Sequence, residues 1–559
     1  MACFTRMSLP SFSSQSSLFS TAALGPELFA QSDRYRLFAQ KIYPLLVQAR
    51  GVMAQAYCAE DGRPATEPVL LLGVSLLQFL EGAPDRQAVE TLRYHAGWNF
   101  ALNRQLGEEI FHPTTLTYFR QRLIAHGLSR LAFESVLQGL VEAGLVERRN
   151  AQRLDSMQVF GLVSRMSRLE CVRESLRLAL KDLEAKADPL SRPPFWPRQW
   201  ERYVESKLDY RLERAALEIK MNEAGQDGRE LLAWVQKLGD ETLRQRPAVQ
   251  LLQRVLAENF QDASEAAPTQ TPCQPPGAVH NPHDPEAQWA AKGQGKHKKE
   301  HVGYKLQVAE TVPQKTLAKG EPTTAFLTAM VTQPAIASDD AGFDLVQEEQ
   351  SATGLDQPSP LYADAAYITA QRLAQARQQK RELIGPAPAP PSKAGRYSVE
   401  DFQICVEDRV AICPAGQANT QCSRMVEEKT GKISYRFEWA RKCRDCPLRA
   451  QCLGSGQEHR TVLVGEHHTA LQARRQEQNT EAFARRCHQR NAMEGTQSEL
   501  VRAHGARRAR YRGLEKARLQ NYFIGAACNA KRWIRRMIWE LKQAHIGAKA
   551  SLTTGLAHA

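Results

Sequence analysis

The spacing of apolar residues changes along this chain, and the change limits the folds that it can adopt. Up to about residue 260 apolar residues recur at three- and four-residue intervals, as in residues 69–79, which predicts helices. Residues 302–312 and 324–331 alternate instead, which predicts strands of a hairpin. Further short strand-like runs lie at 360–363 and 381–384, with a helical stretch between them. We therefore expect an α/β (α+β) fold in which a mixed sheet is flanked by helices.

Three acidic residues lie at positions that could matter for chemistry. Asp155 lies inside a strand-like run, residues 154–160, where a carboxylate is unfavourable unless it has a partner or a function. Asp364 follows the apolar run 360–363, and a side chain at the carboxyl end of a strand can project into a cleft. Glu494 lies in a helical stretch.

Carboxylates from two strands and a helix can converge on two cations, about 3.5–4 Å apart, that activate water and stabilise a leaving oxygen. Mg²⁺ suits such a site because it keeps water and phosphate oxygens among its ligands. The chain has 61 acidic residues, however, and an acid near a strand end is more often a turn or cap residue. Physical reasoning alone therefore does not select these three acids.

The charge of the chain points to a polyanionic partner. The net charge is +13 and the pI is about 9.2, which favours nucleic acid without indicating any specificity. Between residues 502 and 542, twelve Lys and Arg residues are opposed only by Glu515 and Glu540. We expect this segment to be a helix with one buried face and one face that contacts phosphate. The expected DNA-binding residues there are Arg502, Arg507, Arg508, Arg510, Arg512, Lys531 and Arg532.

Several classes of protein are disfavoured by what the sequence lacks. No apolar run reaches the ~18–20 residues of a membrane span, and the N-terminus does not resemble a secretory signal. We therefore expect a cytoplasmic protein whose 12 cysteines are reduced or metal-bound. No phosphate-binding loop motif occurs, so no nucleotide cofactor is expected.

The cysteines form a second pattern. Cys443 and Cys446 make a CxxC pair, and with Cys413 and Cys452 they match a tetrahedral structural Zn²⁺ site. Cys405 or Cys422 could replace one of these ligands. The alternatives are unpaired thiols in a loop-rich insert or an iron–sulfur cluster. We expect so short a segment to lack a hydrophobic core of its own.

A series of short motifs occurs in a fixed order between about residues 40 and 545, and together they are more specific than any one of them. They are Leu154-Asp155-Ser156, His283-Asp284-Pro285-Glu286-Ala287, Gly303-Tyr304-Lys305, Tyr362-Ala363-Asp364-Ala365-Ala366-Tyr367, Arg490-Asn491-Ala492-Met493-Glu494-Gly495-Thr496, Arg510-Tyr511-Arg512-Gly513 and Asn529-Ala530-Lys531-Arg532. This order resembles the DDE transposases of bacterial insertion sequences, and within them the insertion-sequence 1182 group.

The resemblance implies an RNase H-like catalytic core with Asp155 on its first strand, Asp364 on its fourth and Glu494 on a late helix. It implies two Mg²⁺ (or Mn²⁺) ions, double-stranded DNA as partner (element ends and target), a homodimer on DNA, and a bacterial, nucleoid-associated protein. Arg490 would contact DNA phosphate near the acids. Its alternative role is a helix-surface ion pair with Glu494.

Two positions depart from the pattern of that family, and three functions remain open. Cys487 and Val501 stand where such enzymes often carry tyrosine and lysine, and Glu499 is a minor rival to Glu494. The chain could be a transposase that cleaves DNA and transfers strands. It could instead be a catalytically silent, transposase-derived DNA-binding protein, or an RNase H-like nuclease without strand transfer.

The same patterns divide the chain into segments. We expect a disordered leader (1–34), a helical and possibly DNA-binding N-terminal domain (35–150), the first core strand (151–162), a helical insertion (163–262), a linker (263–285), the catalytic core (286–395), a Cys-rich zinc insertion (396–466), a basic helical end of the core (467–545) and a tail (546–559).

Overall fold

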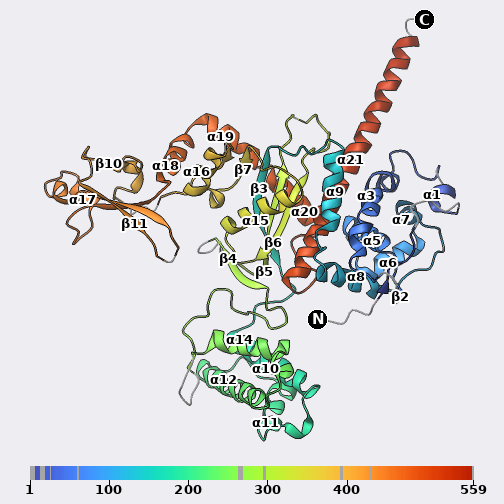
Figure 1. Cartoon of the computed structure of the whole chain (residues 1–559), viewed down its shortest axis with the longest axis horizontal. Helices are drawn as coiled ribbons and strands as arrows, with labels where there is room; N and C mark the ends of the chain where they lie inside the picture. The colour runs from blue at the N-terminus through green and yellow to red at the C-terminus, as the bar shows by residue number, and fades with distance from the viewer. Residues whose placement is uncertain are drawn as a thin grey trace.

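A central mixed sheet joins three peripheral parts of the molecule (Figure 1). The computed structural model describes residues 7–12, 19–24, 27–58, 62–261, 269–293, 298–315, 317–390, 395–428 and 430–556. In Figure 1 the N-terminal helices lie on one side of the sheet and the Cys-rich segment on the other, with a helical insertion below. No helix within the described residues is both long and apolar enough to cross a bilayer.

The N-terminal part is helical, as its periodicity predicts. Its main helices are α5 (Pro68–Glu81), α6 (Asp85–Tyr94), α8 (Thr114–Ala125) and α9 (Leu131–Glu142), preceded by α2 (Arg34–Leu37), α3 (Tyr43–Gln48) and α4 (Arg50–Ala54) and with α7 (Ala96–Ala101) between α6 and α8. Helix α5 begins after the Glu67 cap and ends at Gly82, whose left-handed φ of 73° favours glycine. Its apolar residues join one core with α9 and the C-terminal helix.

Parts of the leader expected to be disordered over residues 1–34 form short elements of regular structure. Strand β1 (Met7–Ser8) pairs in parallel with β2 (Arg63–Pro64). After it, α1 (Thr21–Leu24) begins at Thr21, whose hydroxyl donates to the Arg104 carbonyl over 2.9 Å. These contacts attach the described leader segments to the N-terminal helices. Residues 1–6, 13–18 and 25–26 lie outside the described residues.

The central sheet has the order β4-β5-β3-β7-β8, with β6 also paired to β5. Strand β3 pairs antiparallel with β5 on one edge and parallel with β7 on the other, and β7 pairs parallel with β8. The strands are β3 (Gln152–Phe160), β4 (Gln288–Lys292), β5 (Lys299–Thr311), β6 (Leu327–Pro334), β7 (Leu361–Tyr362) and β8 (Leu383–Ile384).

Helices cover both faces of the sheet. Leu306 and Val308 of β5 belong to the core that contains Phe523 of α21 (Leu514–Leu556). Ala309, the next residue along β5, belongs to a separate core with Phe343 of α15 (Asp339–Ala352). The alternation of side chains along a strand therefore divides the core into two layers. Helix α16 (Ala370–Gln378) joins β7 to β8.

The segment between β3 and β4 forms a separate helical unit. Its helices are α10 (Arg168–Glu184), α11 (Trp196–Trp200), α12 (Arg214–Lys237), α13 (Glu241–Arg244) and α14 (Pro247–Asn259). A Ser167–Glu170 capping box starts α10. The unit has its own core, which includes Leu176, Leu231 and Leu252.

The linker expected over residues 263–285 is corrected for its described part, because residues 269–285 pack against their neighbours. Thr271 accepts from Arg168, and the Asp284 carboxylate accepts from the Tyr304 hydroxyl over 2.8 Å. The Gly513 amide also donates to Asp284, so this segment joins β5 to the start of α21. Residues 263–268 lie outside the described residues.

The Cys-rich segment is inserted between β8 and the final helices, and the expectation that it lacks a core is wrong. It contains the hairpin of β9 (Gln403–Cys405) and β10 (Val410–Ile412) and a three-stranded sheet of β11 (Gln421–Val426), β12 (Ile433–Glu438) and β13 (Thr461–Gly465). Between β12 and β13 lies the short helix α17 (Arg449–Cys452). Phe402, Phe437 and Trp439 are at most 1% exposed and form the centre of this core.

Helices complete the chain. They are α18 (His468–Glu477), α19 (Glu481–Cys487), α20 (Met493–His504) and α21. Helix α21 runs from the central core to the C-terminus as one long rod (Figure 1). It reaches Leu556, so it includes most of the tail expected over residues 546–559, and residues 557–559 lie outside the described residues.

Candidate active site

Two of the expected acids lie side by side on neighbouring strands. Arg153 of β3 is level with Tyr362 of β7 in the parallel register. Two residues farther along each strand direction are Asp155 and Asp364, so continuing this register brings them to the same level. Both side chains are partly exposed, and Asp364 lies just past the end of β7, where it caps the turn of residues 365–367.

The surroundings of Asp155 oppose its ionised form. Burial raises the pKa of Asp155 most, and the negative charge of Asp364 raises it further. The Ser156 amide, which donates to Oδ1 over 2.8 Å, and the positive charges of Arg490 and Lys292 lower it. Asp364 Oδ1 accepts only from the Ala365 amide, at 2.7 Å, among the described contacts. Two neighbouring carboxylates with few counter-charges form a site that a cation would stabilise.

Arg490 lies directly against Asp155. Its Nη1 atom is 3.4 Å from Asp155 Oδ2. The alternative ion pair between Arg490 and Glu494 is absent from the described contacts, because the guanidinium turns toward the strand. Arg490 ends the short turn of residues 488–490 that precedes α20, so this turn holds the start of α20 near Asp155.

Glu494 lies in the first turn of α20, and its side chain is exposed. Three residues farther along the helix, Gln497 donates to the Ser156 carbonyl over 3.3 Å. Arg490, Glu494 and Gln497 have the spacing of one helix face. Arg490 and Gln497, which precede and follow Glu494 on that face, both contact β3. Within the described residues, the two aspartates and Glu494 do not form a group whose ligand atoms all lie within 4.8 Å of one another. The structure thus places Glu494 beside the aspartates without contact.

A fully buried acid that the sequence interpretation missed connects the strand of Asp155 to the helix of Glu494. Glu310 of β5 is 0% exposed and accepts from Arg153 over 2.7 Å and from Arg532 over 2.9 Å. The Thr496 hydroxyl of α20 also donates to Glu310 over 2.8 Å. Arg153 in addition donates to the Gln489 carbonyl. The sequence feature that could have revealed Glu310 is the presence of an acid within the alternating run 302–312.

This network changes the roles expected for two residues. Arg532, expected to bind DNA, is 3% exposed, and its guanidinium is paired with Glu310 and with Glu499. Burial between two carboxylates removes it from contact with phosphate. Glu499, the rival to Glu494, points away from the aspartates. Its carboxylate pairs with Arg532 and lies 3.6 Å from Arg535. Its position at the α20–α21 interface does not favour the catalytic alternative.

The other expected DNA-binding cations divide into exposed and half-buried groups. Arg507 and Arg508 follow α20, and the Arg507 carbonyl accepts from Phe160 at the end of β3. Arg508 forms a bridge with Phe160 on the edge of β3 that faces β7, because β5 occupies the other edge. Both side chains are exposed, and they lie beside the end of β3, five residues past Asp155. Arg502 and Arg512 are exposed, whereas Lys531 is half-buried, as is Arg510, which lies over the Phe79 ring.

The four expected zinc ligands surround one small cavity. Cys413, Cys443, Cys446 and Cys452 all line it, together with Trp439 and Arg460. The Arg460 amide donates to Cys443 Sγ over 3.4 Å, as amides do toward thiolate ligands. No three of these sulfurs come within 4.8 Å of one another in the part of the chain that the structure describes. Cys405 instead contacts Asp408 and Glu407, and neither Cys405 nor Cys422 lines the cavity.

Comparison with protein families gives two matches. Residues 412–534 match the family described as "Transposase DDE domain", and residues 27–122 match "Transposase domain (DUF772)". The first match includes Glu494 and most of the Cys-rich segment, whereas Asp155 and Asp364 lie before it. Comparison with curated proteins and with solved structures finds no significant match. The two matches support a DDE transposase, and the mixed α/β fold is consistent with one.

Proposed function

We propose that this protein is a DNA transposase of the insertion-sequence 1182 group that cleaves the ends of its element and joins them to target DNA. The adjacent carboxylates of Asp155 and Asp364, with Arg490 3.4 Å from Asp155, are the observation that carries the proposal. The proposal includes an RNase H-like core, formed by the sheet of β3, β5, β6, β7 and β8. The two family matches support the transposase class.

The donor set suits divalent cations of the Mg²⁺ or Mn²⁺ type. Asp155 and Asp364 would hold them from the strands, and Glu494 would complete the set from the exposed first turn of α20. Carboxylates are the protein ligands that Mg²⁺ prefers, and the partial exposure of both aspartates leaves room for water and phosphate oxygens. Bound there, two such ions supply an activated water and stabilise the leaving oxygen of a phosphodiester.

The side chains around the acids would position the DNA. Arg490 presents a guanidinium beside Asp155, where it can hold a phosphate by paired hydrogen bonds. Arg507 and Arg508 add exposed positive charge beside the end of β3. Contacts of this kind orient the duplex without reading its sequence. End recognition would then fall to other surfaces, of which the N-terminal helices are one.

The direct test is cleavage of a plasmid carrying the DNA that flanks this gene. Full-length protein should cut at the element ends with Mg²⁺ or Mn²⁺, should not cut with chelator, and should form strand-transfer products. Cuts without joined products would favour an RNase H-like nuclease. Binding without cutting under either metal would favour a silent DNA-binding protein. Either result would contradict the proposal.

Replacing Arg490 with alanine should lower the rate of cleavage on the order of 10-fold to 100-fold, because a charged donor beside the reacting phosphate is lost. The rate is measured in single turnover with saturating DNA. Arg485→Ala is the matched control, since Arg485 is exposed in the preceding helix and has no described side-chain partner. Equal rates for the Arg490→Ala and Arg485→Ala proteins would remove Arg490 from the site.

We also propose that Cys413, Cys443, Cys446 and Cys452 bind one structural Zn²⁺, because they share a cavity in the Cys-rich segment. Cys446→Ser should remove one zinc ion per chain, as elemental analysis would measure. It should also make the Cys-rich segment more sensitive to protease, because the metal joins the loops around α17 to its core. Cys422→Ser is the control. A variant at Cys446 with unchanged zinc content would contradict this site.

A further inference from the structure

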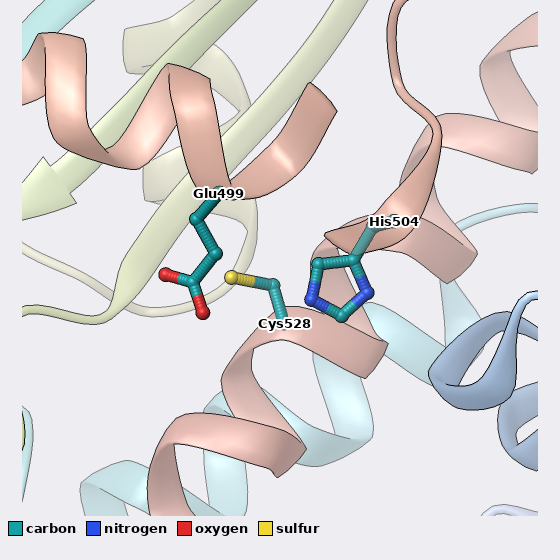
Figure 2. A group of neighbouring side chains, drawn as sticks. All are labelled: Glu499, His504 and Cys528. Carbon is teal, nitrogen blue, oxygen red and sulfur yellow. The ribbon is translucent and has the colours of Figure 1, made fainter. Parts of the chain in front are cut away.

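A second group of potential metal ligands lies between α20 and α21, away from the candidate active site and the Cys-rich segment. Glu499 and His504 belong to α20, and Cys528 belongs to α21. One ligand atom of each lies within 4.8 Å of the others, and Figure 2 shows the three side chains pointing toward one another. Among the described residues no other trio of His, Cys, Asp or Glu side chains meets this limit.

His504 and Cys528 are buried, Glu499 is half-buried, and Glu499 and His504 have polar atoms without a hydrogen bond. His504 is 2% exposed, and neither of its ring nitrogens has a hydrogen-bond partner of normal geometry. Glu499 uses Oε2 for Arg532, whereas its buried Oε1 has no hydrogen bond. Cys528 is 0% exposed. Buried polar atoms are nearly always satisfied, and an ion is one explanation for those that are not.

We propose that Glu499, His504 and Cys528 bind one transition-metal ion, with Zn²⁺ as the species that their oxygen, nitrogen and sulfur atoms suit. Zinc takes carboxylate, imidazole and thiolate ligands at about 2.0–2.3 Å, which places the ligand atoms about 3.5 Å apart in a tetrahedron. The present separations, at most 4.8 Å, thus need to close by up to about 1.3 Å. Mg²⁺ is a poor fit because it prefers an all-oxygen octahedron.

The protonation states of His504 and Cys528 determine which proton must leave when a metal ion binds. Burial lowers the pKa of His504 to about 4, so its imidazole is neutral and can donate a lone pair. Burial raises the pKa of Cys528 to about 12, so its sulfur carries a proton when no metal ion is bound. Binding therefore exchanges the thiol proton, released to water, for a metal–sulfur bond.

The neighbouring cations limit the affinity of the site without excluding it. Lys531, Arg532 and Arg535 all lie near Glu499. Arg532 is also paired with Glu310, whose carboxylate offsets its charge. The thiolate formed on binding supplies a further negative charge. A bound ion would fasten the end of α20, and with it the helix of Glu494, to α21.

Zinc content of the full-length protein, measured after purification in zinc-buffered solution, tests the proposal. We expect two zinc ions per chain in wild type and one in Cys528→Ala. Cys171→Ala is the matched control, because Cys171 is an equally buried thiol in another core, and it should keep both ions. A Cys528→Ala protein with wild-type zinc content would overturn the proposal.

A second measurement separates this site from the Cys-rich site and from misfolding. Cys446→Ser protein loaded with Co²⁺ should show the absorption of a cobalt ion with one thiolate ligand, and His504→Gln in that background should abolish it. Absence of this absorption in folded Cys446→Ser protein would also overturn the proposal. Unchanged zinc in Cys446→Ser would contradict only the Cys-rich site.

Discussion

Asp364→Asn protein is expected to cleave DNA about 1,000-fold more slowly than wild type, or worse, while binding DNA with similar affinity. Asparagine has the same shape and can still accept from the Ala365 amide, but it lacks the charge that holds a divalent cation. Metal catalysis contributes several kcal/mol to such reactions, and about 4 kcal/mol corresponds to 1,000-fold. Single-turnover cleavage and a gel-shift titration measure the two quantities.

The same substitution should not destabilise the fold, which separates loss of chemistry from misfolding. Asp155 and Asp364 repel each other, and removing one charge relieves that repulsion. The thermal midpoint of Asp364→Asn should therefore equal or exceed that of wild type. Asp356→Asn serves as the control, since Asp356 is exposed before β7 and its side chain has no described partner. Wild-type cleavage by Asp364→Asn would refute the assignment.

The elements of the fold that periodicity predicts are those with one apolar face. The runs at 69–79, 154–160 and 302–312 form α5, β3 and β5. Helix α15 was missed, because its sequence, Asp-Asp-Ala-Gly-Phe-Asp-Leu-Val-Gln-Glu-Glu-Gln-Ser-Ala, has few apolar residues and packs through Phe343 and Val346 on one narrow side. The described part of the expected linker was misjudged for a related reason. Its order depends on polar contacts such as Asp284 with Tyr304, which no local pattern reveals.

The candidate site was predictable only in part from the sequence. Composition and spacing could not select Asp155 and Asp364 from so many acids, and the ordered motifs of a family did. The sequence interpretation assigned Arg532 to DNA because it lies in a basic segment. The burial of Arg532 depends on its pairing with Glu310, a residue more than two hundred positions earlier. Glu310 lies in β5, within a largely apolar run. Long-range pairs between charges leave no periodic signal in either segment.

Replacing Glu310 with glutamine should lower the free energy of unfolding of the central core by about 3–5 kcal/mol. Removing one partner from a buried ion pair leaves the other charge uncompensated, which typically has an effect of that size. Here Arg153, at 6% exposure, loses its carboxylate partner, and Arg532, at 3% exposure, keeps only Glu499. Hydrogen exchange of amides in β3 and β5 measures the change, because it reports on the core separately from the helical insertion and the Cys-rich segment.

Glu321→Gln provides the comparison for Glu310, because Glu321 also pairs with an arginine of α21, Arg536 at 2.5 Å, but near the surface. Surface pairs contribute little, so this variant should change protection far less. Glu310→Gln should also slow cleavage while leaving DNA affinity nearly unchanged, since Glu310 holds Thr496, two residues from Glu494, against the strand of Asp155. Equal core protection in the two variants would show that the buried network does not fix α20. Full cleavage by a measurably destabilised Glu310→Gln protein would show instead that Glu494 does not need that support.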